Sequence, residues 1–366
     1  MFQIRGLRRS LRVFVGSIVL FVVSIVLVVT VVSRGEAQQA TSIAFDNSRP
    51  SAPTVLITPP TGTGFGTAAR NTMFLCSNFA GFNTTGITLT TPNTSWVDGQ
   101  KLILSKIPYI VGEVDWNKVP NARPEFRTSV QYGMRRFKGN GIPNHPTGIF
   151  PMLANQPAYQ YYAAVPDPSG EYESAAEMPM APYDLDISVP ANPVYSKTPS
   201  CFNDLTIGVV TQTGATLHAN IALASGPNPY VDPVAALPMD KCWGHPYDKQ
   251  YHYHGYSWKC FPNQGKAKEH SPLFGYALDG FGVYGPRGDG GKLMSNKDLD
   301  ECHGHFGLIN WNGQGKYMYH YHVNNEYPYG PGCYRGTPAT VPTNMKHSHF
   351  KAAPATDSEG KVHHRA

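Results

Sequence analysis

The chain has 366 residues, a formal net charge of +5 and only 15% charged residues, whereas glycine (36), proline (32) and tyrosine (21) are abundant. Frequent glycine and proline among apolar residues predict short strands joined by many turns, and they argue against helical bundles and coiled coils. Lysine and arginine form no stripe with interleaved aromatic residues, so the sequence also argues against nucleic-acid binding.

Residues 1–37 have the organisation of an export signal. Four arginines precede an uncharged run of 20 residues from Val13 to Val32, and the small residues Gly35 and Ala37 offer a signal-peptidase site. We expect cleavage after Ala37, which leaves a net charge of only +1. The run is also just long enough to span a bilayer, so an uncleaved membrane anchor through residues 13–32 is the alternative. In both cases we expect the rest of the chain to be secreted or to lie on the extracellular face of the membrane.

Residues 38–66 are rich in Ser, Thr, Pro and Gly, and we expect a linker here that leads into a β domain at 67–336. Alternating and β-branched residues predict strands at 86–90, 101–104 and 207–211. Asn83 and Asn93 stand in sequons, which would make the protein a glycoprotein in a eukaryotic host.

Prolines and aromatic residues crowd the stretch 112–200, where we expect irregular β structure with long loops. Only Lys292–Glu301 has the composition of a helix, and residues 337–366 are predicted to be a loose tail. The predicted fold class is therefore mostly β: an irregular, disulfide-stapled, β-sandwich-like domain.

An internal duplication is the most informative feature. The segment Asp240–His245 recurs 60 residues later as Asp300–His305, with the shared pattern Asp-x-Cys-x-Gly-His. Each copy then reaches a Tyr-His-Tyr-His tetrapeptide and ends at a further cysteine. The two repeats are 240–260 and 300–333, and their tetrapeptides are 251–254 and 319–322. Two copies of one supersecondary unit are expected to pack with pseudo-symmetry.

The six cysteines fit an oxidising compartment, where an even number suggests three disulfides with 15 conceivable pairings. We favour one disulfide inside each repeat. The predicted pairs are Cys242–Cys260, Cys302–Cys333 and Cys76–Cys201.

The tetrapeptides predict a metal site. Successive side chains of a strand point to opposite faces, so His252 and His254 share one face. Two imidazoles spaced in this way can converge on one cation, and His245 would complete a set of three. The second copy offers the equivalent set His305, His320 and His322.

Neutral imidazole suits several transition metals, and we expect copper or zinc as the cofactor. Asp240 and Asp300 are expected to orient the imidazoles from outside the ligand set. Two separate sites and one shared dinuclear site both fit the duplication.

The same residues have a structural alternative. Alternating Tyr and His could form a half-buried strand without a metal, in which each imidazole binds a carboxylate or a carbonyl. A single His-x-His favours this alternative, whereas six histidines at matched positions favour the metal. His218 is expected to be a packed residue, and the duplication does not support His303 as a ligand.

With these residues in view, the chain resembles the YHYH-domain family of exported proteins. The resemblance extends over about 141–336 and includes, besides both repeats, Gly141–His145, His270–Pro272 and Asp279–Gly285. It implies a mostly β extracellular domain, and the family's activity is poorly defined. It also draws attention to His270 and Asp279 as weak catalytic candidates, although a packed histidine and a turn-capping aspartate are the favoured interpretations.

Three functions therefore compete. The first is a metal-binding extracellular domain, and the second is a structural or cell-surface protein without metal or catalysis. The third, a carbohydrate-binding module, rests only on the β architecture and the aromatic residues. The sequence has no Ser-His-Asp elbow, Walker loop or dinucleotide fingerprint, so it favours no classical hydrolase, nucleotide-binding protein or dehydrogenase.

Overall fold

The computed structural model describes residues 56–57, 67–81, 89–92, 95–99, 101–152, 156, 158, 179–223, 230–261 and 265–346. All of them belong to a compact unit, Phe45–Ala366. The predicted export signal, the asparagines of both sequons and the histidines after residue 346 lie outside the described residues. Within those residues, no helix combines the length and the apolar character that a membrane span requires.

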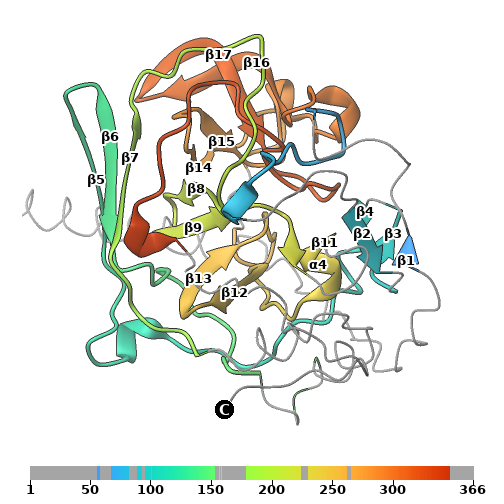
Figure 1. Ribbon diagram of the computed structural model, residues 1–366, viewed down its shortest axis with the longest axis vertical. Coiled ribbons are helices and arrows are strands. Elements are labelled where there is room, and N and C mark those ends of the chain that lie inside the picture. The colour runs from blue at the N-terminus through green and yellow to red at the C-terminus, as the bar shows by residue number, and fades with distance from the viewer. Residues whose placement is uncertain are drawn as a thin grey trace, which may run out of the picture. The chain divides into compact units, whose positions relative to one another are not determined.

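The largest sheet has eight strands in the order β12-β13-β9-β8-β14-β15-β17-β16 (Figure 1). Neighbouring strands are antiparallel except for two parallel pairs, β13–β9 and β15–β17. The strands are β8 (Thr206–Val210), β9 (Ala215–His218), β12 (Gly244–Tyr247), β13 (Gln250–Tyr253), β14 (Leu273–Ala277), β15 (Gly282–Tyr284), β16 (Gly304–Trp311) and β17 (Gln314–His322).

The strand order and the strand directions read the same from both edges of this sheet. One half, β8-β9-β12-β13, therefore corresponds to the other half, β14-β15-β16-β17, with the junction between β8 and β14. Val209 and Tyr276 are partners across this junction. A Cβ atom on Gly208 would lie 2.6 Å from the carbonyl oxygen of Tyr276, and one on Gly275 would lie 2.2 Å from that of Val209. The symmetric strand order, together with this reciprocal close approach, relates the two halves of the whole sheet and not only the His motifs.

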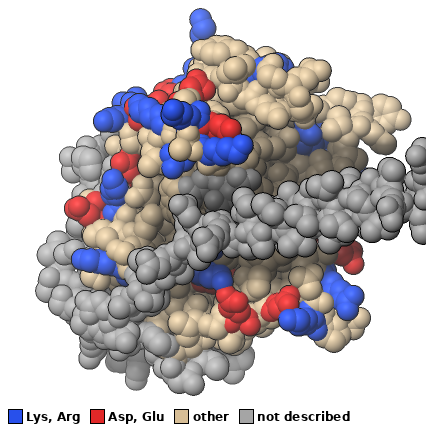
Figure 2. All heavy atoms as spheres, turned by 180° about the vertical axis from the view of Figure 1, so that it is seen from behind, with Lys and Arg blue, Asp and Glu red and all other residues tan. Residues whose placement is uncertain are grey.

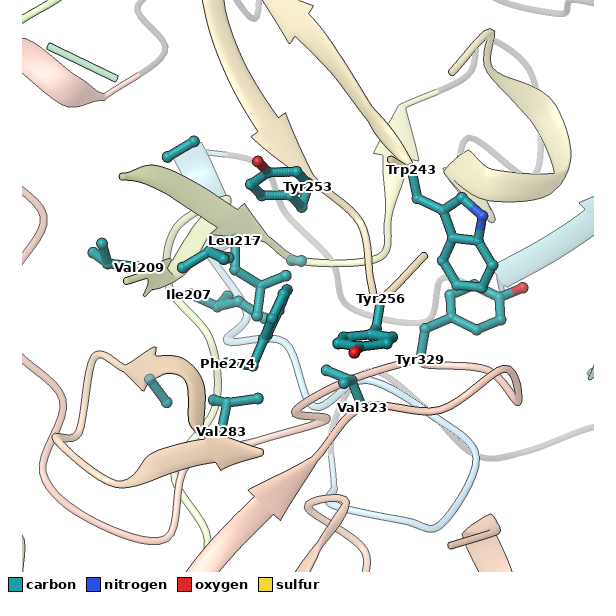
Figure 3. Close-up of a cluster of buried hydrophobic side chains, with 14 of the residues drawn as sticks. Ile207, Val209, Leu217, Trp243, Tyr253, Tyr256, Phe274, Val283, Val323 and Tyr329 are labelled. Atoms are coloured by element: carbon teal, nitrogen blue, oxygen red, sulfur yellow. The ribbon is translucent and has the colours of Figure 1, made fainter. Parts of the chain in front are cut away.

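Both halves contribute to one hydrophobic core (Figure 3). Val209 and Leu217 come from the first half, and Phe274 and Val283 come from the second. All four side chains are almost completely buried. Tyr253 of the first tetrapeptide belongs to the same cluster, so the His motifs are anchored directly in the core.

Three smaller sheets accompany the large one. β5 (Phe126–Gln131), β6 (Met134–Gly139) and β7 (Leu185–Pro190) form an antiparallel sheet, in which alternate residues of β7 are buried. A second sheet has the order β1-β2-β11-β10, with β1 (Leu56–Ile57), β2 (Leu89–Pro92), β11 (Tyr230–Val231) and β10 (Ala222–Leu223). The third pairs β3 (Val97–Asp98) with β4 (Lys101–Leu102).

Helical structure in the described part is limited to short segments. The α-helix α4 (Pro233–Ala236) begins with Asp232 as its N-cap, whose side chain accepts a hydrogen bond from the backbone N–H of Val234. The 3-10 turns are η1 (Phe79–Gly81), η2 (Trp116–Lys118), η3 (Asp289–Gly291), η4 (Asn296–Asp298) and η5 (Thr343–Met345).

The predicted mostly β, disulfide-stapled fold is confirmed, and the bonds are Cys76–Cys201, Cys242–Cys260 and Cys302–Cys333, the pairs favoured from the sequence. Three expectations differ from the structure. The predicted helix Lys292–Glu301 is wrong, since it contains only the turn η4. The predicted linker contains strand β1. The predicted tail packs into the domain up to residue 346, because Val341 and Met345 are buried against the core.

The face in Figure 2 mixes basic and acidic side chains at several places among uncharged residues. On this face they form no continuous basic surface.

Candidate metal centre

The Asp-x-Cys-x-Gly-His segment is a turn that the aspartate holds closed. Oδ1 of Asp240 accepts hydrogen bonds from the backbone N–H groups of Cys242 (2.8 Å) and Gly244 (3.3 Å). Oδ1 of Asp300 accepts the equivalent bonds from Cys302 (2.9 Å) and Gly304 (3.0 Å). An aspartate that binds the backbone two residues on is a common turn former.

The glycine of the motif is required by the tyrosine that packs against it. A Cβ on Gly244 would lie 2.3 Å from the hydroxyl oxygen of Tyr251, and a Cβ on Gly304 would lie 2.3 Å from that of Tyr319. The preceding residues, Trp243 and His303, have φ angles of 59° and 70°. Each turn thus reverses the chain tightly and delivers the following histidine to the first strand of a hairpin.

The two hairpins have the same register. His245 on β12 is paired with His252 on β13, and His305 on β16 is paired with His320 on β17. The backbone N–H of the last histidine, His254 or His322, donates to the carbonyl of the residue before the motif glycine. The disulfide of each repeat joins the turn to a segment that follows its own hairpin, since Cys260 and Cys333 lie beyond the last strand of each hairpin.

The tyrosines occupy the face opposite the histidines, as strand alternation predicts. The hydroxyls of Tyr251 and Tyr319 donate to the carboxylates of Asp240 and Asp300 at 2.9 and 3.0 Å. Burial raises the pKa of both tyrosines well above the usual value, so they remain neutral donors. Asp240 and Asp300, expected to orient the imidazoles, therefore orient the tyrosines and the turn instead.

The first histidine cluster consists of His245, His252 and His254. Nε2 of His254 lies 3.1 Å from Nε2 of His245 and 3.0 Å from Nε2 of His252. The three side chains are exposed by no more than 3%. His218, on the neighbouring strand β9, stacks on His252 with ring centroids 3.8 Å apart.

The second histidine cluster consists of His270, His305, His320 and His322. Nε2 of His305 lies 3.1 Å from Nε2 of His322, and Nε2 of His270 lies 3.0 Å from Nε2 of His320. His320 and His322 are fully buried, whereas His270 and His305 are partly exposed. The sequence analysis favoured a packed role for His270, whereas the structure places it in this cluster. The only sequence signal for His270 was the His-Ser-Pro segment of the family resemblance.

Backbone carbonyls fix the orientation of four of these rings. Nδ1 of His252 faces the carbonyl of Gln250 at 3.1 Å, and Nδ1 of His320 faces the carbonyl of Met318 at 3.1 Å, the same position in each repeat. The two remaining contacts are His322 to the carbonyl of Gly285 at 2.6 Å and His270 to the carbonyl of Ser271 at 2.8 Å. A carbonyl oxygen can only accept, so Nδ1 carries the proton in all four rings.

Nitrogen lone pairs therefore face one another in the second cluster. Burial lowers the pKa of His270, and it lowers that of His320 to about 3, so both rings are neutral near pH 7. A neutral ring with its proton on Nδ1 has a bare lone pair on Nε2. Two such lone pairs 3.0 Å apart repel unless a positive charge lies between them.

The first cluster has a similar shortage of protons. Nε2 of His254 contacts two other Nε2 atoms, and one proton can serve only one of these contacts. Burial lowers the pKa of His254 well below its usual range and that of His245 to about 4, so added protons are disfavoured. Neither Nδ1 of His245 nor Nδ1 of His254 makes a hydrogen bond of regular geometry. The backbone of Pro238 is the acceptor beside His245, and the backbone of Ala219 is the acceptor beside His254.

The clusters form two groups, one in each half of the sheet. Strands β13 and β17 are separated by four strands, which corresponds to roughly 24 Å along the sheet at about 4.8 Å per strand. Of the two arrangements that the sequence left open, two separate sites agree with this topology.

The other candidate residues have structural partners. Asp279 is fully buried, and its carboxylate accepts hydrogen bonds from the Tyr321 hydroxyl and from the backbone N–H groups of Phe281, Arg335 and Gly336. This set favours the turn-capping interpretation over a catalytic role. His303 bonds the carbonyl of His322 and the side chain of Asn296, and it lies outside both clusters.

His145 lies close to Cys242 and Cys260, a grouping with the spacing of a metal site. Both sulfur atoms are used in a disulfide, so they offer no thiolate. Nε2 of His145 instead makes a 2.6 Å hydrogen bond with the hydroxyl of Tyr253.

Comparison with known protein families gives a match within the described region. The model of the family described as YHYH protein matches residues 186–295, which agrees with the resemblance seen in the sequence. The matched region contains the first histidine cluster, His270 and Asp279, and it ends before the second copy of the motif. Neither the curated proteins nor the solved structures contain a match.

Proposed function

Because this chain carries a YHYH domain whose histidine motif is present twice, we propose that it is an exported metal-binding protein that holds one transition-metal ion in each histidine cluster. The ligands are Nε2 atoms of His245, His252 and His254 in the first site. In the second site they are drawn from His270, His305, His320 and His322. The all-imidazole donor set suits copper or zinc.

The observation that supports this proposal best is the pair His270 and His320. Their Nε2 atoms lie 3.0 Å apart while both Nδ1 atoms face carbonyl oxygens. Two nitrogens bound to one cation at about 2.0–2.1 Å lie roughly 3.3 Å apart in tetrahedral geometry. A cation therefore converts a repulsive contact into two bonds with little movement, and the carbonyls act as the outer partners that metal-bound histidines commonly have.

Metal content per chain tests the proposal. The mature chain is secreted without a His tag, reconstituted with copper or zinc, desalted and measured by inductively coupled plasma mass spectrometry. We expect two ions per chain. The double variants His252→Ala/His254→Ala and His320→Ala/His322→Ala should each retain one ion.

The matched control is His145→Gln, which removes an imidazole outside both clusters and keeps a polar partner for Tyr253. It should retain both ions. A folded wild-type chain with no stoichiometric metal after reconstitution overturns the proposal. It would favour the second candidate function, an extracellular structural protein whose Tyr and His strands form a polar core.

A further inference from the structure

We infer that the two clusters differ in role: the first is a closed structural site, whereas the second is the one whose metal accepts an external ligand, positioned by Asp289. The ligand class is a small neutral oxygen ligand that donates a hydrogen bond, such as water or the hydroxyl group of a substrate. The inference rests on the proposed metal binding at the same residues.

Access separates the two sites. No side chain of the first cluster is more than 3% exposed, and the stacked ring of His218 covers His252 on one side. In the second cluster His270 and His305 are partly exposed, so the site has a side that faces solvent. Ligand count alone gives the opposite impression, since three protein ligands are typical of open sites and four of closed ones. We give access more weight than ligand count, because all three histidines of the first cluster are buried.

A carboxylate accompanies the second cluster. Asp289 begins the turn η3 and is exposed, and it lies near enough to both His270 and His305 to act on them electrostatically.

Gly307 leaves space for this carboxylate. A Cβ at residue 307 would lie 3.2 and 3.3 Å from the carboxylate oxygens of Asp289 and 3.1 Å from Cε1 of His320. The hydrogen of glycine therefore lets the carboxylate approach the ring edge of a proposed ligand. The equivalent residue of the first repeat is Tyr247, two positions after His245, so the first site has no such gap beside its hairpin.

The charge of Asp289 determines the ligand class. A carboxylate beside the open side of a metal accepts a hydrogen bond from a bound water or hydroxyl group. It repels anions. At roughly 5 Å in water-like surroundings, removing this repulsion should tighten the binding of a monovalent anion about fourfold.

The test uses the full secreted chain loaded with copper(II), with azide as the probe. The copper content is measured first, and azide is then titrated while the electron paramagnetic resonance and visible spectra are recorded. We expect azide to change the spectrum of one of the two copper ions. His245→Ala/His254→Ala should keep the response, and His305→Ala/His322→Ala should lose it.

Two single variants test Asp289. Asp289→Asn should tighten azide binding about fourfold without a change in copper content. Gly307→Ala should alter azide affinity, because the new methyl group displaces the carboxylate or the His320 ring. The matched control is Asp115→Asn, which removes a partly exposed carboxylate outside both clusters and should have no effect.

The outcomes separate this inference from the proposed function. Two bound copper ions with no azide response, a response confined to the first cluster, or an unchanged azide affinity in Asp289→Asn would each overturn the inference and leave metal binding intact. Absence of copper from the wild-type chain would instead overturn the proposed function.

Discussion

His270 and His320 face each other through Nε2 atoms 3.0 Å apart, although 50 residues separate them in the chain. Each ring is held from behind by a backbone carbonyl at its Nδ1 atom. The same arrangement recurs for His252 in the first repeat, where the carbonyl again belongs to the residue two positions earlier. In all three rings Nδ1 therefore carries the proton, and the lone pair of Nε2 faces another histidine of its cluster.

Metal release should occur in two phases. EDTA is expected to remove the ion of the second cluster first, because His270 and His305 are partly exposed whereas the first cluster is buried. Residual metal after timed treatment and desalting measures both phases. The variant His245→Ala/His254→Ala should show only the fast phase. Loss of both ions at one rate in the wild-type chain would contradict the difference in access.

Gly304→Ala should destabilise the protein by about 2–3 kcal/mol, because the new Cβ would lie 2.3 Å from the Tyr319 hydroxyl oxygen in a tightly packed turn. Urea unfolding followed by tryptophan fluorescence measures the change. Gly315→Ala is the matched control on the same hairpin. Its Cβ would meet only Leu308, at 3.9 Å, so its effect should stay within about 0.5 kcal/mol. Equal stability of the two variants would show that the turn can relax around the extra atom.

Removing the disulfide of the second repeat should cost about 3–4 kcal/mol, because Cys302 and Cys333 close a loop of 31 residues. Since Cys302 lies in the turn that delivers His305, metal affinity of the second cluster should fall as well. The double variant Cys302→Ala/Cys333→Ala is compared with Cys76→Ala/Cys201→Ala, which removes a cross-link outside both repeats. A second cluster that binds metal equally well in both variants would argue against this coupling.

Much of the site follows from the sequence. Strand alternation places His252 with His254 and His320 with His322, and the matched Gly-His elements supply His245 and His305. The position of His270 does not follow, because it depends on the parallel pairing of β15 with β17, which brings the start of β14 near the second hairpin. No local pattern encodes that pairing.

The sequence revealed the duplication only in the His motifs and not in the other strands of the sheet. Strands β8 and β14 are equivalent in the sheet, but few of their residues are alike, since core strands accept many apolar side chains. Gly208 and Gly275 are the identical pair, because each lies against the backbone of the opposite strand. From the sequence, Asp240 and Asp300 were expected to orient the histidines. In the structure their carboxylates accept hydrogen bonds from Tyr251 and Tyr319, which lie on the opposite face of the strands.

The buried N-cap Asp232 should give the protein a distinct pH dependence. Burial raises the pKa of Asp232 to about 6, although the Tyr329 hydroxyl and backbone N–H groups stabilise its carboxylate. The folded state then binds more protons than the unfolded state between about pH 4 and pH 6, so the free energy of unfolding falls as the pH rises through this window. Across this window the raised pKa of Asp232 lowers the free energy of unfolding by about 3 kcal/mol.

Urea unfolding of the wild-type chain and of Asp232→Asn between pH 4 and pH 7 measures this contribution. The free energy of unfolding of the variant, relative to that of the wild type, should rise from pH 4 to pH 7. The reason is that the wild type loses stability as Asp232 ionises, whereas the asparagine cannot ionise. Asp115→Asn is the control with the opposite sign, since the Lys118 partner lowers the pKa of that carboxyl. A constant difference between wild type and Asp232→Asn at all pH values would refute the assignment.

Anomalous X-ray diffraction from crystals of the metal-loaded chain tests the central claim most directly. Data collected at the absorption edge of the loaded metal should show one peak among the Nε2 atoms of His245, His252 and His254, and another among those of His270, His305, His320 and His322. Absence of a peak from both clusters, with the imidazoles bonded instead to water or to neighbouring protein groups, would contradict the claim.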